Sequence, residues 1–380
     1  MNAMPSRRLR VGMVGGGRGA FIGAVHRIAV EIDGEAQVVA GALSSNAQTA
    51  ADSAAAWYLA RSYDDYRQMA ISERALSDGI DFVIIATPNH LHYPVAKAFL
   101  EAGIHIVCDK PLAYSLAEAE ALAALVAQGR TLFALTHTYS GYPLVRHARE
   151  LVRQGALGTI RKVIVEYNQA WLMKPLEREG HRQAEWRTDP ARAGLSCCVG
   201  DIGTHAAHLV EFVTGQRISS LCADLNTFVA GRELDDDANM LLRLDGGARG
   251  TLVCSQIACG EENDLNIRVY GTTAGLEWRQ QEPNTLILKP ADGPRQYLRS
   301  GHGYLSPAAI NVTRTPAGHP EGYLEAFGNL YRSFIADVRR VMADEAPLRD
   351  YPTATDGVNG MRFVEAAVRS SSRGAQWETL

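Results

Sequence analysis

The 380-residue sequence predicts an α/β protein with two domains: a parallel-sheet domain, then an α+β domain with a large, mostly antiparallel open sheet. Three features lead to this prediction. Apolar segments alternate with helix-like segments over the first third of the chain, a glycine-rich turn follows the first apolar segment, and strand-like segments succeed one another in the second half. We expect the domains to span residues 1–136 and 137–380.

The first domain is predicted to alternate strands with helices. Its strand-like segments are apolar on both faces, which is typical of a parallel sheet covered by helices on both sides. The segments between them show helical spacing of apolar residues or are rich in small residues. The expected strands are 9–14, 37–42, 81–87, 105–108 and 132–135, and the expected helices are 21–30, 47–60, 65–76, 94–102 and 115–128.

A glycine-rich turn joins the first strand to the first helix. Gly15, Gly17 and Ala20 match the pattern G-x-G-x-x-G/A, which lets the backbone approach a pyrophosphate and direct helix amides toward it. A close-packed connection without a ligand is the alternative interpretation. Because the turn opens a run of βα units, we favour a Rossmann domain that binds NAD or NADP. The expected contacts are Gly15, Gly16, Gly17, Arg18, Ala20, Phe21 and Ile22.

The residues after the second strand bear on the choice between the two cofactors. An acidic side chain there binds the ribose 2′-hydroxyl, whereas an arginine accommodates a 2′-phosphate. This chain has Ser44 and Ser45, which are neither acidic nor basic. Because no cation meets a phosphate at this position, the sequence favours NAD, with NADP as the open alternative.

Two further loops follow strands of the first domain, at the sheet edge where open α/β folds bind ligands. Lys110 lies between a buried strand and a proline, so we expect it near the nicotinamide end of a dinucleotide. A surface ion pair with its neighbour Asp109 is the alternative. The expected cofactor contacts in these loops are Thr87, Pro88, Asn89, His92, Asp109, Lys110 and Pro111.

The second domain is predicted to contain a mostly antiparallel sheet. Helices that begin near Tyr142 and Ile202 are expected to cover one face, and the other face is expected to form a wall of the active site or a subunit interface. The segment 294–322 is rich in Gly, Pro and His and is expected to be a long loop or lid. The expected strands are 160–169, 218–229, 239–244, 248–256 and 266–270, with a hairpin turn at Gly246-Gly247, and the further helices are 142–153, 323–342 and 353–371.

Aromatic and polar side chains of the second domain suit a sugar or polyol ring, which they can stack on and hydrogen-bond. Ordinary packing is an equal alternative for each of them taken alone. The candidate substrate contacts are Tyr139, Gln169, Trp171, Trp186 and Arg187. The acidic run 235–237 resembles a metal site in composition, but consecutive residues point in different directions, so we interpret it as a solvated turn and expect no metal.

Asp201 and His205 are the strongest candidates for catalytic groups in the second domain. Asp201 lies near the expected start of a helix, where capping alone would account for an aspartate. His205 follows four residues later, so both side chains project from one helix face. Oxidation of a secondary alcohol by hydride transfer also requires a proton acceptor. We expect His205 or Lys110 to accept that proton, and both to face one small volume beside the nicotinamide.

The overall composition narrows the class of partner. The net charge is −4 and the basic residues form no long run, which argues against nucleic acids and anionic membranes as partners. No apolar run approaches the roughly 20 residues of a membrane-spanning helix. Residues 1–10 match no export signal, and the six cysteines lack zinc-site spacing, so we expect a cytoplasmic protein that acts on small molecules.

Four motifs together resemble the Gfo/Idh/MocA family of nicotinamide-dependent oxidoreductases. They are the glycine turn leading into Phe21-Ile-Gly-Ala-Val-His-Arg27, Thr87-Pro-Asn-His-Leu-His92, Asp109-Lys-Pro111 and Gly200-Asp-Ile-Gly-Thr-His205. The resemblance covers nearly the whole chain and implies a Rossmann domain, oxidation of sugar, inositol or polyol hydroxyls, and homodimers or homotetramers formed through the C-terminal sheet. Within the family, Ser44-Ser45, Trp171 and Trp186-Arg187 look similar to the branch of levoglucosan dehydrogenase and glycoside 3-dehydrogenases.

The resemblance also assigns roles to particular residues. Lys110 takes the catalytic or cofactor-orienting role, Pro111 the expected cis peptide bond, and Asp201 and His205 the substrate-facing pair. The departure is Asp109, where the family has glutamate; the shorter side chain keeps the charge but changes its reach. Two alternatives to a simple dehydrogenase remain: a glycosidase or lyase that uses NAD for transient oxidation at C3, and a non-catalytic dinucleotide-binding sensor.

Overall fold

The computed structural model describes residues 7–380, which form two compact units. The first unit contains the chain up to Thr138 together with Tyr323–Val358, and the second contains Tyr139–Gly322 and Asn359–Leu380. Residues 1–6, on which the expected lack of an export signal partly rests, lie outside the described residues. Within the described chain, no helix combines the length and apolarity needed to cross a membrane.

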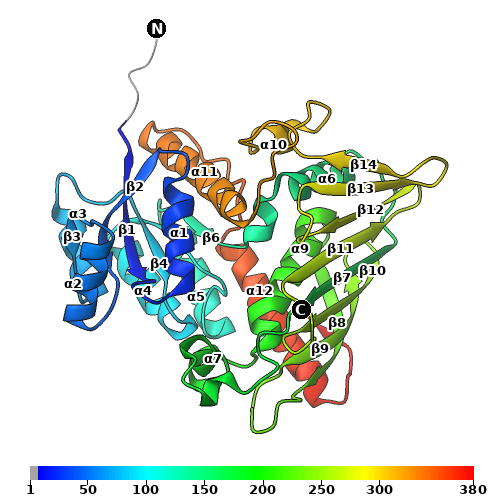
Figure 1. The fold of residues 1–380 in the computed structure, drawn as a ribbon, viewed down its shortest axis with the longest axis horizontal. Helices are drawn as coiled ribbons and strands as arrows, with labels where there is room; N and C mark the ends of the chain where they lie inside the picture. Colours follow the sequence, from blue (N-terminus) through cyan, green and yellow to red (C-terminus); the bar gives the residue numbers. More distant parts are fainter. Residues whose placement is uncertain (1–6) are drawn as a thin grey trace. The chain divides into compact units, whose positions relative to one another are not determined.

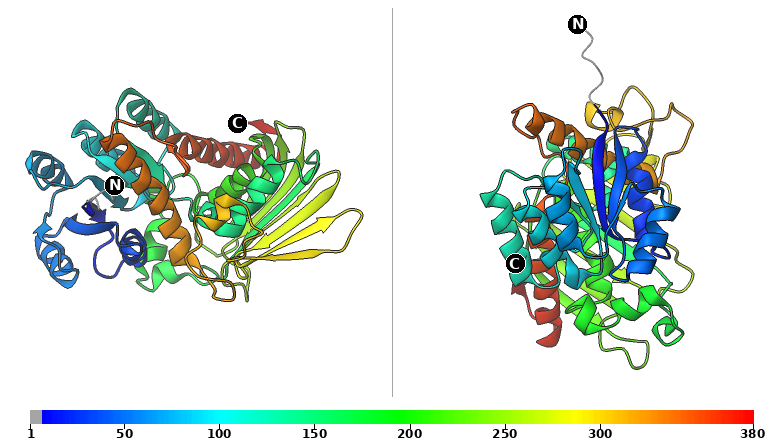
Figure 2. Two further views of the ribbon diagram at one scale, coloured as in Figure 1. Left: turned by 90° about the horizontal axis from the view of Figure 1, so that it is seen from above. Right: turned by 90° about the vertical axis from the view of Figure 1, so that its left-hand side faces the viewer.

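The first unit contains a six-stranded sheet in the order β3-β2-β1-β4-β5-β6, and each neighbouring pair is parallel. Helices cover both faces of this sheet (Figures 1 and 2). The predicted parallel-sheet domain is therefore confirmed. Its strands are β1 (Leu9–Gly15), β2 (Ala36–Ala42), β3 (Arg61–Ser62), β4 (Phe82–Ala86), β5 (His105–Cys108) and β6 (Phe133–Leu135), and its helices are α1 (Phe21–Glu31), α2 (Ala47–Ala56), α3 (Tyr66–Ala75), the 3₁₀ turn η1 (Asn89–Leu91), α4 (His92–Glu101), α5 (Leu116–Gln128) and α11 (Tyr323–Met342).

Side-chain caps explain where several of these helices begin. Asn46 accepts a hydrogen bond from the Thr49 amide at the start of α2, and Ser115 accepts one from the Glu118 amide at the start of α5. Such caps satisfy amides that have no partner within the helix. α1 differs, because its N-cap residue Ala20 supplies no side-chain cap and its first turn contains no acidic residue.

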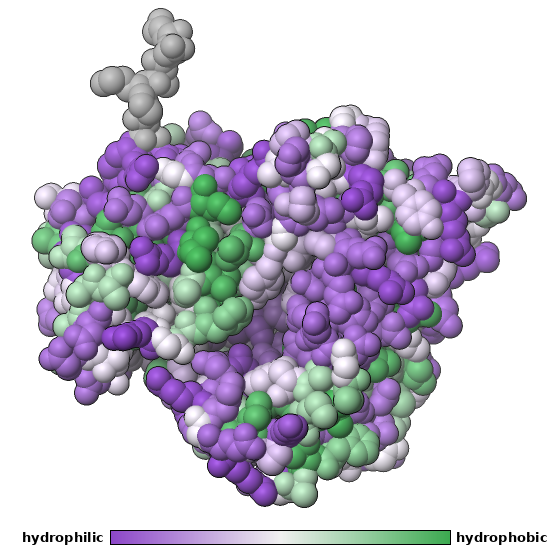
Figure 3. Space-filling view, in the orientation of Figure 1, coloured by the Kyte–Doolittle hydropathy of each residue, from purple (hydrophilic) through white to green (hydrophobic). Residues whose placement is uncertain are grey.

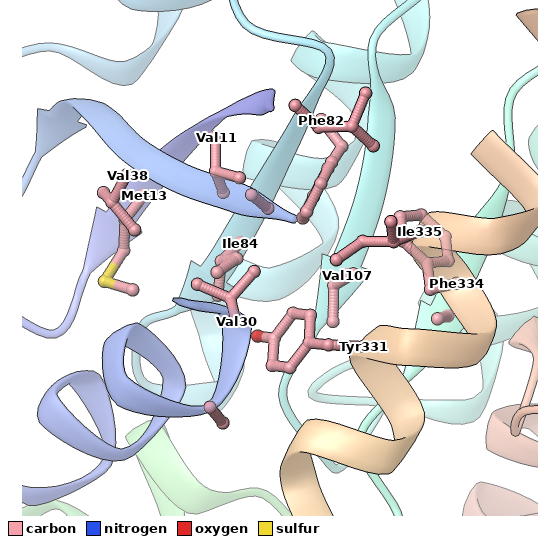
Figure 4. Packing of buried hydrophobic residues seen from close by; sticks show 14 of the residues in the cluster. Val11, Met13, Val30, Val38, Phe82, Ile84, Val107, Tyr331, Phe334 and Ile335 are labelled. Atoms are coloured by element: carbon pink, nitrogen blue, oxygen red, sulfur yellow. The ribbon is translucent and has the colours of Figure 1, made fainter. Parts of the chain in front are cut away.

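The core of the first unit includes α11, which comes from the far end of the sequence. Buried apolar residues recur along α11 at helical spacing, and Phe334 meets Phe82 of β4 edge-on at 5.3 Å between ring centroids. Figure 4 shows Tyr331, Phe334 and Ile335 of α11 near strand residues of this core. The sequence-based boundary placed residues 323–342 in the second domain, whereas their packing assigns α11 to the first unit.

The second unit contains a nine-stranded sheet in the order β14-β13-β12-β11-β7-β10-β9-β8-β15. The β7–β10 pair is parallel and the other pairs are antiparallel, so the predicted mostly antiparallel sheet is confirmed. The strands are β7 (Lys162–Asn168), β8 (Ile218–Asn226), β9 (Asp237–Leu244), β10 (Arg249–Ser255), β11 (Asp264–Tyr270), β12 (Ala274–Arg279), β13 (Thr285–Pro290), β14 (Gln296–Arg299) and β15 (Glu378–Thr379).

Helices α6 (Pro143–Arg153) and α9 (Thr204–Thr214) pack on one face of this sheet, as the sequence predicts (Figure 2, left). In β9, Ala238, Met240, Leu242 and Leu244 are buried, whereas the alternating residues are exposed. This period of two gives the sheet one apolar face and one more polar face. The other helical segments are η2 (Thr138–Gly141), η3 (Leu176–Arg178), α7 (Arg182–Arg187), α8 (Pro190–Ala193), the π-helical turn η4 (Val199–Gly203), α10 (Pro307–Ile310) and α12 (Ala354–Ser372).

The sequence prediction misses several short elements. β3 and β15 contain two residues each, too few to show any periodicity. The segment 294–322, expected to be a single loop, contains β14 and the one-turn helix α10. β14 has exposed or half-buried residues throughout, so it lacks the apolar alternation that identifies a half-buried strand.

Candidate active site

The glycine turn has the backbone conformation that the sequence pattern requires. Gly15, Gly16 and Gly19 have φ angles of 76°, 68° and 84°, a region that residues with a side chain rarely adopt. Gly17 is required for a different reason: a Cβ there would lie 2.7 Å from the carbonyl oxygen of Leu43 at the end of β2. The turn therefore packs its backbone directly against the strand ends.

The start of α1 is held close to this turn. A Cβ on Gly23 would lie 1.9 Å from the carbonyl oxygen of Gly16, so only glycine permits this approach. The Arg18 amide donates to the hydroxyl of Ser53, a fully buried residue of α2, at 3.1 Å. In Figure 3, apolar side chains gather over α1, whose residue Phe21 is 67% exposed.

These features fit a bound dinucleotide. The N-terminus of α1 carries partial positive charge without a side-chain cap or a nearby acid, which suits a pyrophosphate. The hydroxyl of Thr87, at the end of β4, is buried and makes no hydrogen bond within the described chain. Its side chain borders the turn, because a Cβ on Gly15 would lie 2.8 Å from the Thr87 methyl carbon. A buried polar group without a protein partner can bond to a ligand or to an ordered water, so the contact of Thr87 with the cofactor stays a prediction.

The serines after β2 contribute differently. The Ser44 hydroxyl accepts the Asn46 amide at 3.1 Å, and the Asn46 side chain caps α2. Ser45 is exposed, and among residues 7–380 no hydrogen bond of its hydroxyl is seen. Of the two predicted serines, Ser45 therefore has the hydroxyl that is not used in building the loop.

His92 lies in the interior of the first unit rather than at its surface. One ring nitrogen lies 2.6 Å from the Pro111 carbonyl oxygen and the other 2.9 Å from the Thr87 carbonyl oxygen. Burial lowers the pKa of His92 from its ordinary value. Both ring nitrogens therefore connect the two predicted cofactor loops to each other, and a contact of His92 with the cofactor stays a prediction.

Asp109, Lys110 and Pro111 follow β5, and the Lys110–Pro111 peptide bond is cis, as the resemblance implied. The Asp109 carboxylate accepts the Lys110 amide at 2.9 Å and the Thr136 hydroxyl at 2.7 Å, and lies 3.9 Å from a ring nitrogen of His26. Burial by itself would raise the pKa of Asp109, but His26, Lys110 and Thr136 outweigh burial and lower it below its usual range. One oxygen of the Asp109 carboxylate, Oδ1, therefore has contacts from three neighbouring residues.

In the second unit, Asp201 lies in the π-helical turn η4, which continues directly into α9. Its carboxylate does not cap the helix. Instead, one oxygen accepts hydrogen bonds from Arg187 at 3.2 Å and from the buried side-chain amide of Gln256 at 2.9 Å. Asp201 is thus held by side chains from two other segments, which capping does not explain.

The predicted solvated turn at 235–237 is wrong. Asp235 is 6% exposed and Asp236 is fully buried. The Asp235 carboxylate accepts the amides of Cys197 and Val199 at 3.0 and 2.9 Å, and so anchors the start of the turn that carries Asp201. Burial raises the pKa of Asp235. Backbone amides from other segments of the chain donate hydrogen bonds to these carboxylates. The acidic run by itself does not reveal these partners. No cluster of metal-binding side chains occurs among the described residues.

His205 lies among aromatic and amide side chains. Its ring meets Tyr139 edge-on at 4.9 Å and Tyr167 at 6.3 Å between centroids. The two tyrosine hydroxyls are hydrogen-bonded to each other. Asn263 donates to the Tyr139 hydroxyl at 3.2 Å and accepts from Tyr167 and Gln169 at 2.8 and 2.6 Å. The predicted Tyr139, Gln169 and His205 therefore belong to one cluster.

Arg187 joins the predicted tryptophans to Asp201. Its guanidinium lies 4.2 Å from the ring centroid of Trp186 and 5.7 Å from that of Trp171. It also donates to the side chain of Gln183 at 2.7 Å. These four side chains form one aromatic and charged wall around the Asp201 carboxylate.

Sequence reasoning missed Gln183, Asn263 and Gln256 in these clusters. Gln183 and Asn263 lie in segments whose path the sequence pattern does not determine. Gln256 ends the expected strand 248–256, but no motif contains any of the three residues. Lys110 lies in the first unit and His205 in the second. The expectation that they share one small volume therefore stays a prediction.

Two family models match the chain. The model described as an oxidoreductase family with an NAD-binding Rossmann fold matches residues 9–137, and the model of the GFO/IDH/MocA C-terminal domain matches residues 145–277. Both descriptions agree with the resemblance carried by the four sequence motifs.

Three known proteins are similar over most of their length. An oxidoreductase from Sinorhizobium meliloti is 46% identical, with a TM-score of 0.87 and coverage of 98% of this chain and 100% of that chain. An inositol dehydrogenase homologue from Azotobacter vinelandii, solved with NADH and myo-inositol, is 36% identical, with a TM-score of 0.92 and coverage of 99% and 98%. Levoglucosan dehydrogenase from Pseudarthrobacter phenanthrenivorans is 28% identical over 310 residues, which cover 74% of this chain and 76% of that protein. Taken with the six-stranded parallel sheet and the glycine turn, these matches show that the chain belongs to the Gfo/Idh/MocA family of oxidoreductases, with an NAD-binding Rossmann domain.

Proposed function

We propose that this protein is an NAD-dependent dehydrogenase that oxidises a secondary hydroxyl of a sugar, a glycoside or a cyclic polyol. The observation that carries the proposal is the cluster around Asp201 and His205, in a chain whose other unit is an NAD-binding Rossmann domain. Similarity to proteins described with myo-inositol and with levoglucosan supports this substrate class.

The residues of the first unit would hold the cofactor. The glycine turn and the first amides of α1 would bind the pyrophosphate, and the buried Thr87 hydroxyl and Lys110 would contact other parts of the dinucleotide. NAD, when bound, supplies the acceptor for the hydride. The protein must therefore supply substrate orientation and a proton acceptor.

His205 is our candidate for the proton acceptor. An imidazole has an unperturbed pKa near ~6.5, so one ring nitrogen can take the hydroxyl proton as hydride leaves the substrate carbon. Lys110 would orient the hydroxyl oxygen through its ammonium group and favour developing negative charge there. Asp201 would accept a hydrogen bond from the substrate, with Arg187 and Gln256 holding its carboxylate in place.

The tryptophan wall and the tyrosine cluster would bind the substrate ring. Trp171 and Trp186 offer flat apolar faces, and Tyr139, Gln169 and Asn263 offer neutral hydrogen-bonding groups. Burial raises the pKa of Tyr139, which keeps its hydroxyl protonated and neutral. These groups suit a ring with several hydroxyls.

We propose NAD rather than NADP as the preferred cofactor. Neither Ser44 nor Ser45 supplies the cation that a 2′-phosphate needs, and Ser44 is already bonded within its loop. The ratio of kcat/KM for NAD and NADP measures this preference. Ser45→Arg should shift the ratio toward NADP, and a wild-type preference for NADP would contradict the assignment.

A screen of cyclic polyols and glycosides with NAD, followed by absorbance of NADH, tests the proposed reaction. We expect NADH to accumulate with at least one substrate, and we expect Lys110→Met and His205→Asn each to lower kcat at least a hundredfold. Product formation without NADH accumulation would instead indicate transient oxidation in a hydrolase or lyase. NAD binding without turnover of any substrate would favour a dinucleotide sensor.

We also propose that the open face of the nine-stranded sheet joins copies of this chain into a dimer or tetramer. Leu241 is 51% exposed on β9, on the opposite face from the residues packed against the helices. Light scattering should give a mass of two or four chains. Leu241→Arg should lower that mass, whereas Leu348→Arg, at a residue that is 74% exposed, should not. A monomeric wild type would contradict this assembly.

A further inference from the structure

Two residues that have no assigned role from the sequence, His26 within the glycine-turn motif and Tyr331 outside every motif, lie near Asp109. His26 comes from α1, and Tyr331 comes from α11, 305 positions further along the chain. A ring nitrogen of His26, Nδ1, lies 2.6 Å from the Tyr331 hydroxyl, and the other, Nε2, lies 3.9 Å from a carboxylate oxygen of Asp109. His26 is fully buried and Tyr331 is 1% exposed.

Repulsion between lone pairs decides which nitrogen of His26 faces Asp109 with a proton. An N–H at Nε2, toward the carboxylate 3.9 Å away, avoids that repulsion and leaves Nδ1 to accept from the Tyr331 hydroxyl. Burial raises the pKa of Tyr331 well above its ordinary value, which keeps the hydroxyl able to donate. Tyr331 therefore selects the form of His26 that presents an N–H to Asp109.

The ring of His26 has little freedom to leave this arrangement. It packs edge-on against Phe327 at 5.1 Å and against Tyr331 at 6.0 Å between centroids, both from α11. The same Asp109 oxygen that lies nearest His26, Oδ1, accepts the Lys110 amide and the Thr136 hydroxyl. We call the successive contacts from Tyr331 to His26 to Asp109 a row. This row ends at the backbone amide of Lys110.

We propose that His26 and Tyr331 are positioning residues for Lys110, acting through the Asp109 carboxylate. The proposal rests on the proposed function, because it gives Lys110 a role in turnover. In this proposal α11 packs in the core of the first unit and, through Tyr331, also helps to position Lys110. Neither residue touches the substrate in this assignment, so both act only through the placement of Lys110.

Four variants separate positioning from simple packing. Tyr331→Phe removes one hydroxyl, and His26→Leu removes both ring nitrogens. His26→Gln keeps an amide N–H that can reach toward Asp109. Phe334→Leu is the control, because Phe334 is a fully buried aromatic residue of α11 that packs on Phe82 and not on His26.

Hydrogen exchange at the Lys110 amide is the first measurement, made on the full chain without cofactor or substrate. We expect at least tenfold faster exchange in His26→Leu, several-fold faster exchange in Tyr331→Phe, and rates near wild type in His26→Gln and Phe334→Leu. Wild-type exchange in His26→Leu, or equal acceleration in Phe334→Leu, would overturn the proposal.

Steady-state kinetics with a substrate from the polyol screen is the second measurement. We expect kcat to fall about tenfold in His26→Leu and Tyr331→Phe with KM for the substrate changed less than twofold, and His26→Gln to recover most of the kcat. Faster exchange with unchanged kcat would overturn the link to Lys110. If no substrate is turned over by the wild type, the proposed function fails, whereas the exchange measurement still decides whether this row holds Asp109.

Discussion

The side-chain amide of Gln256 donates to Asp201 at 2.9 Å from a fully buried position directly after β10. Gln256 also accepts a hydrogen bond from the Cys197 thiol at 3.4 Å, so both ends of its amide are used. A residue outside every sequence motif therefore fixes the orientation of the proposed substrate-facing carboxylate.

Replacement of this glutamine should affect both stability and activity. Gln256→Leu keeps the approximate volume but removes one of the donors to the partly buried Asp201 carboxylate, a loss of about 1–3 kcal/mol for a hydrogen bond to a charged group. We expect a lower free energy of unfolding by denaturant and a kcat/KM reduced about tenfold. Gln296→Leu, at an exposed residue of β14, is the matched control and should leave both quantities near wild type.

The close approach of α1 to the glycine turn predicts a defect in cofactor binding. In Gly23→Ala the new methyl would lie 1.9 Å from the Gly16 carbonyl oxygen, so α1 must shift away from the turn. We expect NAD affinity, measured by titration, to fall at least tenfold. Gly360→Ala adds a methyl where no atom lies within 4 Å and should leave NAD affinity unchanged. Equal NAD affinity in Gly23→Ala and the wild type would contradict this role of the turn.

The lowered pKa of Asp109 predicts how stability depends on acidity. Because its folded-state pKa lies below the unfolded value near ~3.9, the unfolded chain takes up the proton first as the pH falls. Asp109 therefore adds stability above about pH 4 that is lost as the pH falls toward its folded-state pKa. The slope contributed by one proton is at most about 1.4 kcal/mol per pH unit.

Asp109→Asn should remove the pH-dependent part of the stability, because the asparagine side chain does not titrate. Its amide oxygen can still accept hydrogen bonds. Denaturant unfolding at a series of pH values should show the stability difference between wild type and variant shrinking below about pH 4. A difference that stays constant from neutral pH into acid would show that Asp109 does not titrate in this way.

The contacts of Arg187 predict that a positive charge alone at position 187 is not enough for normal substrate binding. Arg187→Lys keeps the positive charge but loses the planar group that lies over Trp186 and bonds to both Asp201 and Gln183. We expect the substrate KM to rise at least fivefold, with a smaller change in kcat. Arg182→Lys, an exposed position in the same helix, serves as the control. A substrate KM in Arg187→Lys that matches the control would remove Arg187 from substrate binding.

The sequence predicts the parts of this protein that depend on local patterns. The strand, turn and helix around Gly15 follow from apolar periodicity and from glycines required by positive φ, and both are visible in single segments. The long apolar stripe of α11 likewise predicts a helix, and the structure has the same bounds, 323–342. The choice of the core against which α11 packs is a long-range contact, which a local pattern does not contain.

The site shows the same division between local and long-range information. Asp201 and His205 can be identified from the sequence because they lie four residues apart. Gln256 contacts Asp201, and Asn263 contacts Tyr139 beside His205, from segments that are distant in the sequence. Asp235 shows that an acidic run does not always lie in solvent. Acidic residues are usually solvated, but the Asp235 carboxylate is buried and accepts hydrogen bonds from the backbone amides of Cys197 and Val199.

The discontinuity of the first unit has a consequence for how the chain is made. Phe82, Val107 and their neighbours stay without the packing of α11 until residues 139–322 have left the ribosome. At roughly 5–20 residues per second, this delay lasts roughly 10–40 s. The N-terminal unit therefore completes its core only after residues 139–322 of the second unit and α11 itself have been synthesised. A fragment ending near residue 138 would expose the apolar surface that α11 covers.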